Sequence, residues 1–211
     1  PDARYLVPED EVKLLAPVPR PGKILGLSAM YGDPARPGAP RPQYPVVFGK
    51  FASTVIGNGE PIVIPRVSNE VDYEAELGVV IGRLARRVAE ADALSYVAGY
   101  LAVNDVTARD WARHSSHWTA GKNFDTFGPL GPVLVTADEI PDPHHLELVL
   151  RLNGEELQHA NTGDMNFSIP WLIAYLSTAM TLEPGDIIST GTPAGTGASR
   201  TPQVFLKPGD E

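Results

Sequence analysis

The chain has 211 residues, of which 26 are Asp or Glu and 17 are Lys or Arg, so its formal net charge is −9. An acidic chain without basic runs argues against nucleic acid and anionic membrane as partners. The absence of Cys excludes disulfides, thiolate metal sites and cysteine nucleophiles. Because no apolar run could span a membrane and no signal-peptide pattern opens the chain, we expect a cytoplasmic protein.

The first half of the chain predicts short strands separated by turns. Residues 22–28 (GKILGLS), 45–57 and 61–65 (PIVIP) predict strands, whereas residues 32–45 hold five Pro and predict a loop. Residues 71–82 (VDYEAELGVVIG) predict a further strand. A helix-like pattern begins at residue 89 and passes into a strand at 99–107, and residues 108–116 predict a short helix.

The second half contains the clearest local patterns. Residues 146–160 alternate on both sides of Asn153-Gly154, the preferred pair for a tight hairpin turn. Residues 168–180 predict a helix with Ser168 as N-cap and Pro170 in its first turn. Strands are also predicted at 128–136 and 182–193.

Strands therefore dominate, and the few helices do not alternate regularly with them. This pattern favours an α+β fold that is mostly β, with a mixed β-sandwich or roll as its core. We expect an N-terminal linker segment at 1–21 and one folded domain at 22–211.

Three carboxylates are candidates for a metal site. Glu74 and Glu76 are two residues apart and share a strand face, and Asp105 sits among apolar neighbours in a second strand-like segment. Buried carboxylates repel one another, and a hard divalent cation removes that cost. A solvated polar face of an amphipathic strand, with Asp105 in a turn, is the alternative, and the pattern alone leaves both open.

Two cations and one loop are candidates for binding an acidic substrate. Arg109 follows Asp105 by four residues, and Lys122 lies between Gly and aromatic residues; ordinary surface positions are the alternative. The loop 191–197 (GTPAGTG) lacks the spacing of a phosphate loop, but its backbone and Thr192 can bind an oxyanion. The five His show no zinc spacing, and no G-x-S-x-G motif occurs.

Several motifs in this order resemble the fumarylacetoacetate hydrolase superfamily, over about residues 61–210, including its acylpyruvate hydrolase and 2-hydroxyhepta-2,4-diene-1,7-dioate isomerase members. The segments that carry the resemblance are VDYEAELGVVIG, GYLAVNDVTARDW, WTAGKNFDTFGPLGPVLVT, the stretch from LNGEELQHA to TGTPAGTG, and LKPGD.

The resemblance implies a compact, mostly β catalytic core, a homodimer, and a Mg²⁺, Mn²⁺ or Ca²⁺ ion. Family members hold the ion with two Glu and one Asp, which match Glu74, Glu76 and Asp105 here. Substrate-site residues of family members match Arg109, Lys122 and Thr192.

The family cleaves acylpyruvates, decarboxylates oxaloacetate or isomerises unsaturated 2-hydroxy dioates. We therefore predict a metal-dependent hydrolase that cleaves a C–C bond in a small 2-oxo or 1,3-diketo acid through a metal-stabilised enolate, with Lys122 stabilising the charge. The alternatives are an isomerase or decarboxylase of 2-oxo or 2-hydroxy dioates, and an inactive metal-binding relative.

One motif departs from the family pattern. Hydrolytic members carry NYxxHxxE after the first strand, whereas the matching region here, GLSAMYGDPARPGAP, has Tyr31 but no His or Glu. Tyr31 is therefore a candidate substrate-binding residue and Asp33 a candidate catalytic replacement. The family pattern would also continue past Glu211 into another strand, so we expect a catalytic domain truncated at the C-terminus.

Overall fold

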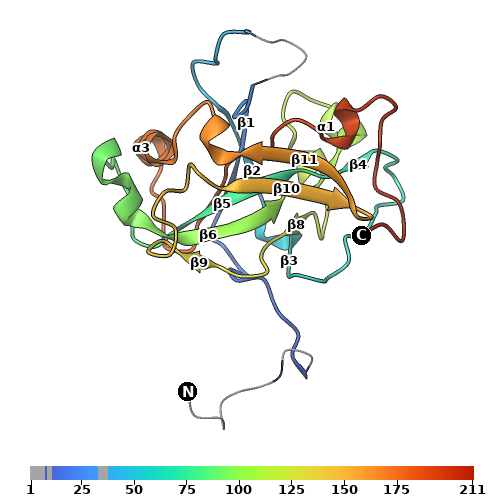
Figure 1. The fold of residues 1–211 in the computed structure, drawn as a ribbon, viewed down its shortest axis with the longest axis horizontal. Coiled ribbons are helices and arrows are strands. Elements are labelled where there is room, and N and C mark those ends of the chain that lie inside the picture. Colours follow the sequence, from blue (N-terminus) through green and yellow to red (C-terminus); the bar gives the residue numbers. More distant parts are fainter. Residues whose placement is uncertain (1–7, 9–10, 33–37) are drawn as a thin grey trace.

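The computed structural model describes residues 8, 11–32 and 38–211, so the candidate Asp33 lies outside the described residues (Figure 1). A six-stranded mixed sheet forms the centre, in the order β2-β1-β12-β5-β6-β9. Only the β1–β12 pair in this sheet is parallel. Its strands are β1 (Ile24–Ser28), β2 (Val46–Lys50), β5 (Ala75–Ile81), β6 (Val97–Asn104), β9 (Val135–Thr136) and β12 (Ile187–Ser189).

Three two-stranded pairs complete the β structure. They are the hairpin β10 (Glu147–Leu152) with β11 (Glu155–Asn161), the parallel pair β3 (Val55–Ile56) with β8 (Gly128–Pro129), and the antiparallel pair β4 (Val71–Asp72) with β7 (Thr107–Ala108). The hairpin turns at Asn153 and Gly154, whose φ angles of 53° and 84° are those of the predicted tight turn. In Figure 1 the hairpin crosses in front of β5 and β6, and β10 contacts β5.

The α-helices are short, and Figure 1 places α1 and α3 at opposite ends of the molecule. They are α1 (Arg109–Ala112), α2 (Thr119–Lys122) and α3 (Ile169–Ala179). Short 3-10 helices are η3 (Ala52–Thr54), η4 (Glu90–Tyr96), η5 (Thr162–Asp164) and η6 (Gly197–Ser199). Ser168 caps α3 as predicted, since its Oγ accepts a hydrogen bond from Trp171 N at 3.3 Å. None of the helices in the described part of the chain has the length and apolar character to cross a membrane.

The apolar core lies on both faces of the central sheet. Leu172, Ile173 and Leu176 of α3 pack against one face together with Val79 of β5. Val80, the next residue of β5, packs into a second cluster with Ile24 and Ile187. Because side chains of a strand alternate, burial on both faces explains the continuous apolar run after Glu76.

The predicted fold class, mostly β with few helices, is confirmed. Several local predictions were wrong in detail. The strand predicted at 71–82 is divided at Tyr73 and Glu74 into β4 and β5, and the strand predicted at 128–136 is divided into β8 and β9. Residues 61–65 form no strand, and Val63 is 58% exposed there, because Pro at both ends removes backbone donors that a ladder needs. The strand predicted at 45–57 is interrupted by η3, and the helix-like pattern at 89 is the 3-10 helix η4.

The domain boundary at residue 22 stays a prediction. Within the segment assigned to a linker, Ala16 is buried in the second apolar cluster beside Val80 and Ile187.

Candidate metal centre and substrate pocket

Glu74, Glu76 and Asp105 lie together, with one ligand oxygen from each within 4.8 Å of the others. All three are buried. The pairing of β5 with β6 explains the approach, because Glu76 lies opposite Val103 and Asp105 N donates to Glu74 O at 2.9 Å. Glu74 lies just before β5, Glu76 lies within it and Asp105 follows β6 directly, so the pairing of these two strands brings the three predicted carboxylates to one place.

Two buried lysines contact these carboxylates. Lys122 Nζ lies 2.7 Å from Glu74 Oε2 and 2.5 Å from Asp105 Oδ2. Lys50 Nζ lies 2.7 Å from Asp105 Oδ1 and donates to the carbonyl oxygen of Lys122 at 2.7 Å. The sequence analysis did not single out Lys50. It is a charged residue at the end of an apolar strand, and such a residue usually lies on the protein surface.

The proximity of these charges shifts their pKa values in opposite directions. Although burial disfavours its charge, Asp105, Glu74 and Glu76 hold the pKa of the Lys122 ammonium above its usual range. Burial raises the pKa of Asp105, but Lys122 and Lys50 more than offset this and lower it to about 2. Burial lowers the pKa of Lys50. Both shifts favour a charged Lys122 beside an ionised Asp105.

Glu76 has one satisfied and one unsatisfied oxygen. Its Oε2 accepts from Ser189 Oγ at 2.5 Å and from Gly191 N at 2.9 Å. Gly191 has a φ of 86°, and a Cβ there would approach Leu27 O to 2.9 Å, so only glycine fits this turn. Burial, followed by the charges of Asp105 and Glu74, raises the pKa of Glu76 well above its usual value.

The donor set fits a hard divalent cation. Glu76 Oε1 is buried and has no hydrogen-bond partner among the described residues, so a charged oxygen there needs a cation. Three carboxylates are the oxygen ligands that Mg²⁺, Mn²⁺ and Ca²⁺ accept. Glu74, Glu76 and Asp105 are thus the residues that would hold the ion.

Asp72, which alternates with Glu74 and Glu76 along the chain, has a separate environment. Its carboxylate accepts from Gly197 N at 2.7 Å, from Ala198 N at 3.0 Å and from Arg109 Nε at 2.7 Å. Arg109 also pairs through Nη2 with Glu74 Oε1 at 2.6 Å. Asp72 therefore joins the loop at η6 to Arg109, and it stays outside the carboxylate cluster.

A buried glutamine orients the threonine of the 191–197 loop. Gln158 Nε2 donates to Thr192 Oγ1 at 2.8 Å and to Pro193 O at 2.9 Å, while its Oε1 accepts from Ala75 N at 2.9 Å. Thr192 Oγ1 in turn donates to Ala75 O at 2.9 Å. Gln158 thus holds the loop against β5. No sequence pattern singles it out within the alternating hairpin strand.

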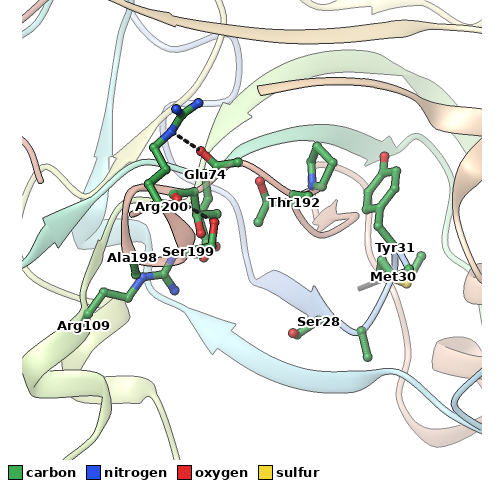
Figure 2. A pocket seen from close by; sticks show the side chains of 15 residues that line it. Ser28, Met30, Tyr31, Glu74, Arg109, Thr192, Ala198, Ser199 and Arg200 are labelled. Carbon is green, nitrogen blue, oxygen red and sulfur yellow. Dashed lines mark hydrogen bonds and ion pairs between the residues drawn. The ribbon is translucent and has the colours of Figure 1, made fainter. Parts of the chain in front are cut away.

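A cavity of about 700 Å³ opens beside the carboxylates (Figure 2). Glu74, Arg109, Tyr31 and Thr192 line it, so it gathers four of the predicted site residues. A second cavity of about 180 Å³ shares Glu74, Arg109 and Thr192 with the first and adds Lys122. In Figure 2 Arg109 and Tyr31 lie on opposite sides, with Thr192 between them.

Tyr31 lines the larger cavity and packs against the main apolar cluster. The hydroxyl is buried and has no hydrogen-bond partner in the described part of the chain. Burial, with smaller contributions from Glu76 and Asp164, raises the pKa of Tyr31, so the group stays a neutral donor. A donor of this kind suits an anionic ligand oxygen.

The sequence matches a known protein family over most of its length. The family model described as fumarylacetoacetate (FAA) hydrolase C-terminal matches residues 26–211. The chain belongs to this family. The predicted resemblance is therefore confirmed.

Relatives in this family include named enzymes. The chain is 48% identical over 209 residues to "Oxaloacetate tautomerase FAHD2A, mitochondrial" of Bos taurus, covering 98% of this chain and 67% of the relative. It is 51% identical over 202 residues to a "Putative hydrolase" of Burkholderia ambifaria, covering 94% of this chain and 72% of the relative. The chain thus spans about two thirds of the length of the tautomerase.

Solved structures of the family share the fold. A 5-carboxymethyl-2-hydroxymuconate delta-isomerase from Mycobacterium smegmatis has a TM-score of 0.86 and 37% identity, over 97% of this chain and 77% of that chain. A fumarylacetoacetate hydrolase from Exiguobacterium antarcticum has a TM-score of 0.89 and 37% identity, over 96% of this chain and 74% of that chain. The proteins similar to this chain therefore include some named isomerases and some named hydrolases.

Proposed function

We propose that this chain is a divalent-metal-dependent tautomerase or isomerase of a small 2-oxo dicarboxylic acid such as oxaloacetate. The observation that carries the proposal is the 48% identity, across 98% of the chain, to an enzyme named oxaloacetate tautomerase. The cluster of Glu74, Glu76, Asp105 and Lys122 supports it, because keto–enol exchange needs charge stabilisation at one oxygen.

We assign the metal to Glu74, Glu76 and Asp105, with Mg²⁺ as the leading ion and Mn²⁺ or Ca²⁺ as alternatives. When bound, the ion supplies Lewis-acid polarisation of the 2-oxo group. Within the described part of the chain, Glu76 Oε1 has no hydrogen-bond partner and is the oxygen of the cluster left for the ion.

The protein residues act on the charge that tautomerisation moves. The C3–H bond breaks and its proton passes to water, while its electron pair forms the C2–C3 double bond. The carbonyl π electrons pass to the oxygen on C2, which takes up a proton from water in return. Negative charge therefore develops on that oxygen. We assign its stabilisation to Lys122, whose ammonium stays protonated and lines the smaller cavity. Thr192 and Tyr31 offer further hydroxyl groups to the bound acid.

C–C hydrolysis, the leading prediction from the sequence, is the second candidate. The 51% identity to a relative named putative hydrolase favours it. Hydrolysis requires a base that activates water, yet residues 29–45 contain no His and no Glu. None of the described residues that line the large cavity is a His. Tautomerisation needs no activated water, so we rank it first.

Parallel assays separate these functions. The protein with Mg²⁺ is tested for conversion of enol to keto oxaloacetate, for decarboxylation of oxaloacetate and for cleavage of acetylpyruvate. We expect tautomerisation to dominate, to be abolished by Glu76→Gln, and to survive Arg151→Gln on the exposed hairpin. Cleavage of acetylpyruvate at the higher rate would favour the hydrolase. Metal binding without any turnover would identify an inactive relative.

The homodimer and the cytoplasmic location stay predictions of the sequence analysis. Light scattering of the purified protein tests the first, and fractionation of the source cells tests the second.

A further inference from the structure

We propose that Arg200 binds the second carboxylate of the substrate, the one remote from the 2-oxo group, and so selects dicarboxylic over monocarboxylic acids. The inference rests on the proposed function, since it assigns that carboxylate a partner. Arg200 lines the 700 Å³ cavity together with Arg109 and Glu74.

Arg109, the arginine that sequence analysis singled out, is already paired. Its Nε lies 2.7 Å from Asp72 Oδ2 and its Nη2 lies 2.6 Å from Glu74 Oε1. Two carboxylates therefore compensate its single positive charge. A third anion at Arg109 would have to compete with both, in a site where Arg109 is only 20% exposed.

Arg200 has a different set of contacts. Its Nη2 donates to Leu157 O at 2.7 Å and its Nε donates to Gly195 O at 3.3 Å. Both acceptors are neutral carbonyls, and no carboxylate in the described part of the chain forms an ion pair with Arg200. A guanidinium has five N–H donors, so donors remain for a ligand. Arg200 thus offers an uncompensated charge to the cavity.

The backbone around Arg200 is held in place before any ligand binds. Asp72 accepts hydrogen bonds from Gly197 N and Ala198 N at the start of η6, and Arg200 N donates to Gly197 O at 3.3 Å. The two carbonyl contacts then restrain the guanidinium itself. A restrained arginine loses less side-chain entropy on binding a carboxylate than a free one.

The arrangement indicates how a diacid would lie. In Figure 2 Arg200 and Arg109 lie on the same side of the cavity, away from Tyr31, and Thr192 lies between. The 2-oxo acid end belongs near Glu74 and Lys122, and the far carboxylate near Arg200. A monocarboxylic acid fills the first position and leaves Arg200 without an anion.

Malate and lactate test the proposal without turnover, because these 2-hydroxy acids differ by one carboxylate and have no 2-oxo group to tautomerise. Calorimetry in saturating Mg²⁺ gives both dissociation constants for the unmodified protein, Arg200→Gln, Arg200→Lys and the control Arg151→Gln. We expect the unmodified protein and the control to prefer malate. Arg200→Gln should raise the dissociation constant of malate about tenfold or more and leave that of lactate unchanged, as expected for a lost charge-assisted hydrogen bond.

Arg200→Lys keeps the charge and should lose less malate affinity than Arg200→Gln. If the Gln variant folds poorly, the malate and lactate affinities of the Lys variant still test the proposal. If both variants bind malate and lactate equally more weakly, or if malate affinity does not change, the proposal is overturned. Arg200 would then only stabilise the loop through its contacts with the backbone. Failure of the proposed function would give a different result from failure of this inference. A protein that does not tautomerise oxaloacetate but loses malate preference in the Arg200 variants would retain the inference and lose the activity.

Discussion

Lys50 Nζ lies 2.7 Å from Asp105 Oδ1, although 55 residues separate the two in the chain. Lys50 ends β2, at the edge of the central sheet, and its side chain is 1% exposed. It also donates to the carbonyl of Lys122, so one buried lysine contacts a candidate metal ligand and the backbone of a candidate catalytic residue. This edge strand therefore belongs to the site.

Replacing Lys50 should destabilise the protein strongly. Lys50→Met leaves the fully buried Asp105 with one ammonium partner in place of two. Removal of one partner from a buried pair costs about 3–5 kcal/mol. Urea unfolding in the presence of a chelator measures the loss. Arg113→Gln breaks an exposed pair with Glu70 and should cost at most about 1 kcal/mol; equal losses in the two variants would contradict the assignment.

Glu76→Gln should separate metal binding from folding. The amide oxygen of Gln can still accept from Ser189 and Gly191, but residue 76 no longer offers a negative charge to a cation. Since burial favours the neutral form of Glu76, we expect the metal-free free energy of unfolding to fall by no more than about 1 kcal/mol. Calorimetric titration with Mn²⁺ should show no binding. Retained affinity would remove Glu76 from the ligand set.

Asp72→Asn is the matched test for the neighbouring carboxylate. Asp72 pairs with Arg109 and with the η6 backbone and not with the cluster, so the variant should bind Mn²⁺ within a few-fold of the unmodified protein, roughly under 1 kcal/mol of difference. Its free energy of unfolding should fall by about 1.5–3 kcal/mol, the range for hydrogen bonds to a charged group. Loss of metal binding would show that Asp72 is needed to hold the ion together with Glu74 and Glu76.

Gln158→Leu should loosen the loop that carries Thr192. The change removes the donors to Thr192 and Pro193 and the acceptor of Ala75 N, which leaves buried backbone groups unpaired. We expect a loss of about 1–3 kcal/mol in unfolding free energy. Substrate KM should rise more than the metal dissociation constant. Gln43→Leu, at an exposed glutamine, is the control and should change neither.

His159 should titrate above its ordinary pKa of 6.5, because Glu156 and then Glu147 accept hydrogen bonds from its ring. A raised pKa in the folded state stabilises the hairpin at pH values below the unfolded pKa. That stabilisation is lost as pH rises through the folded pKa. NMR titration measures the shift. Glu156→Gln should lower the pKa of His159, whereas Glu155→Gln on the same hairpin should not.

Local patterns in the sequence were sufficient for several features. The mostly β fold, the turn at Asn153-Gly154, the cap at Ser168 and the family follow from periodicity, turn chemistry and motif order, which are properties of neighbouring residues. The candidate ligands Glu74, Glu76 and Asp105 also came from the sequence, because Glu74 and Glu76 flank the start of β5 and Asp105 directly follows β6.

The tertiary structure decided which distant residues complete the site. Lys50 reaches Asp105 because β2 pairs with β1, and Gln158 reaches Thr192 because the hairpin packs beside β5. Carboxylates surround Arg109, whereas carbonyl oxygens contact Arg200. Side-chain charges act over a few ångströms, and sheet order, which no local pattern encodes, determines which charges come that close.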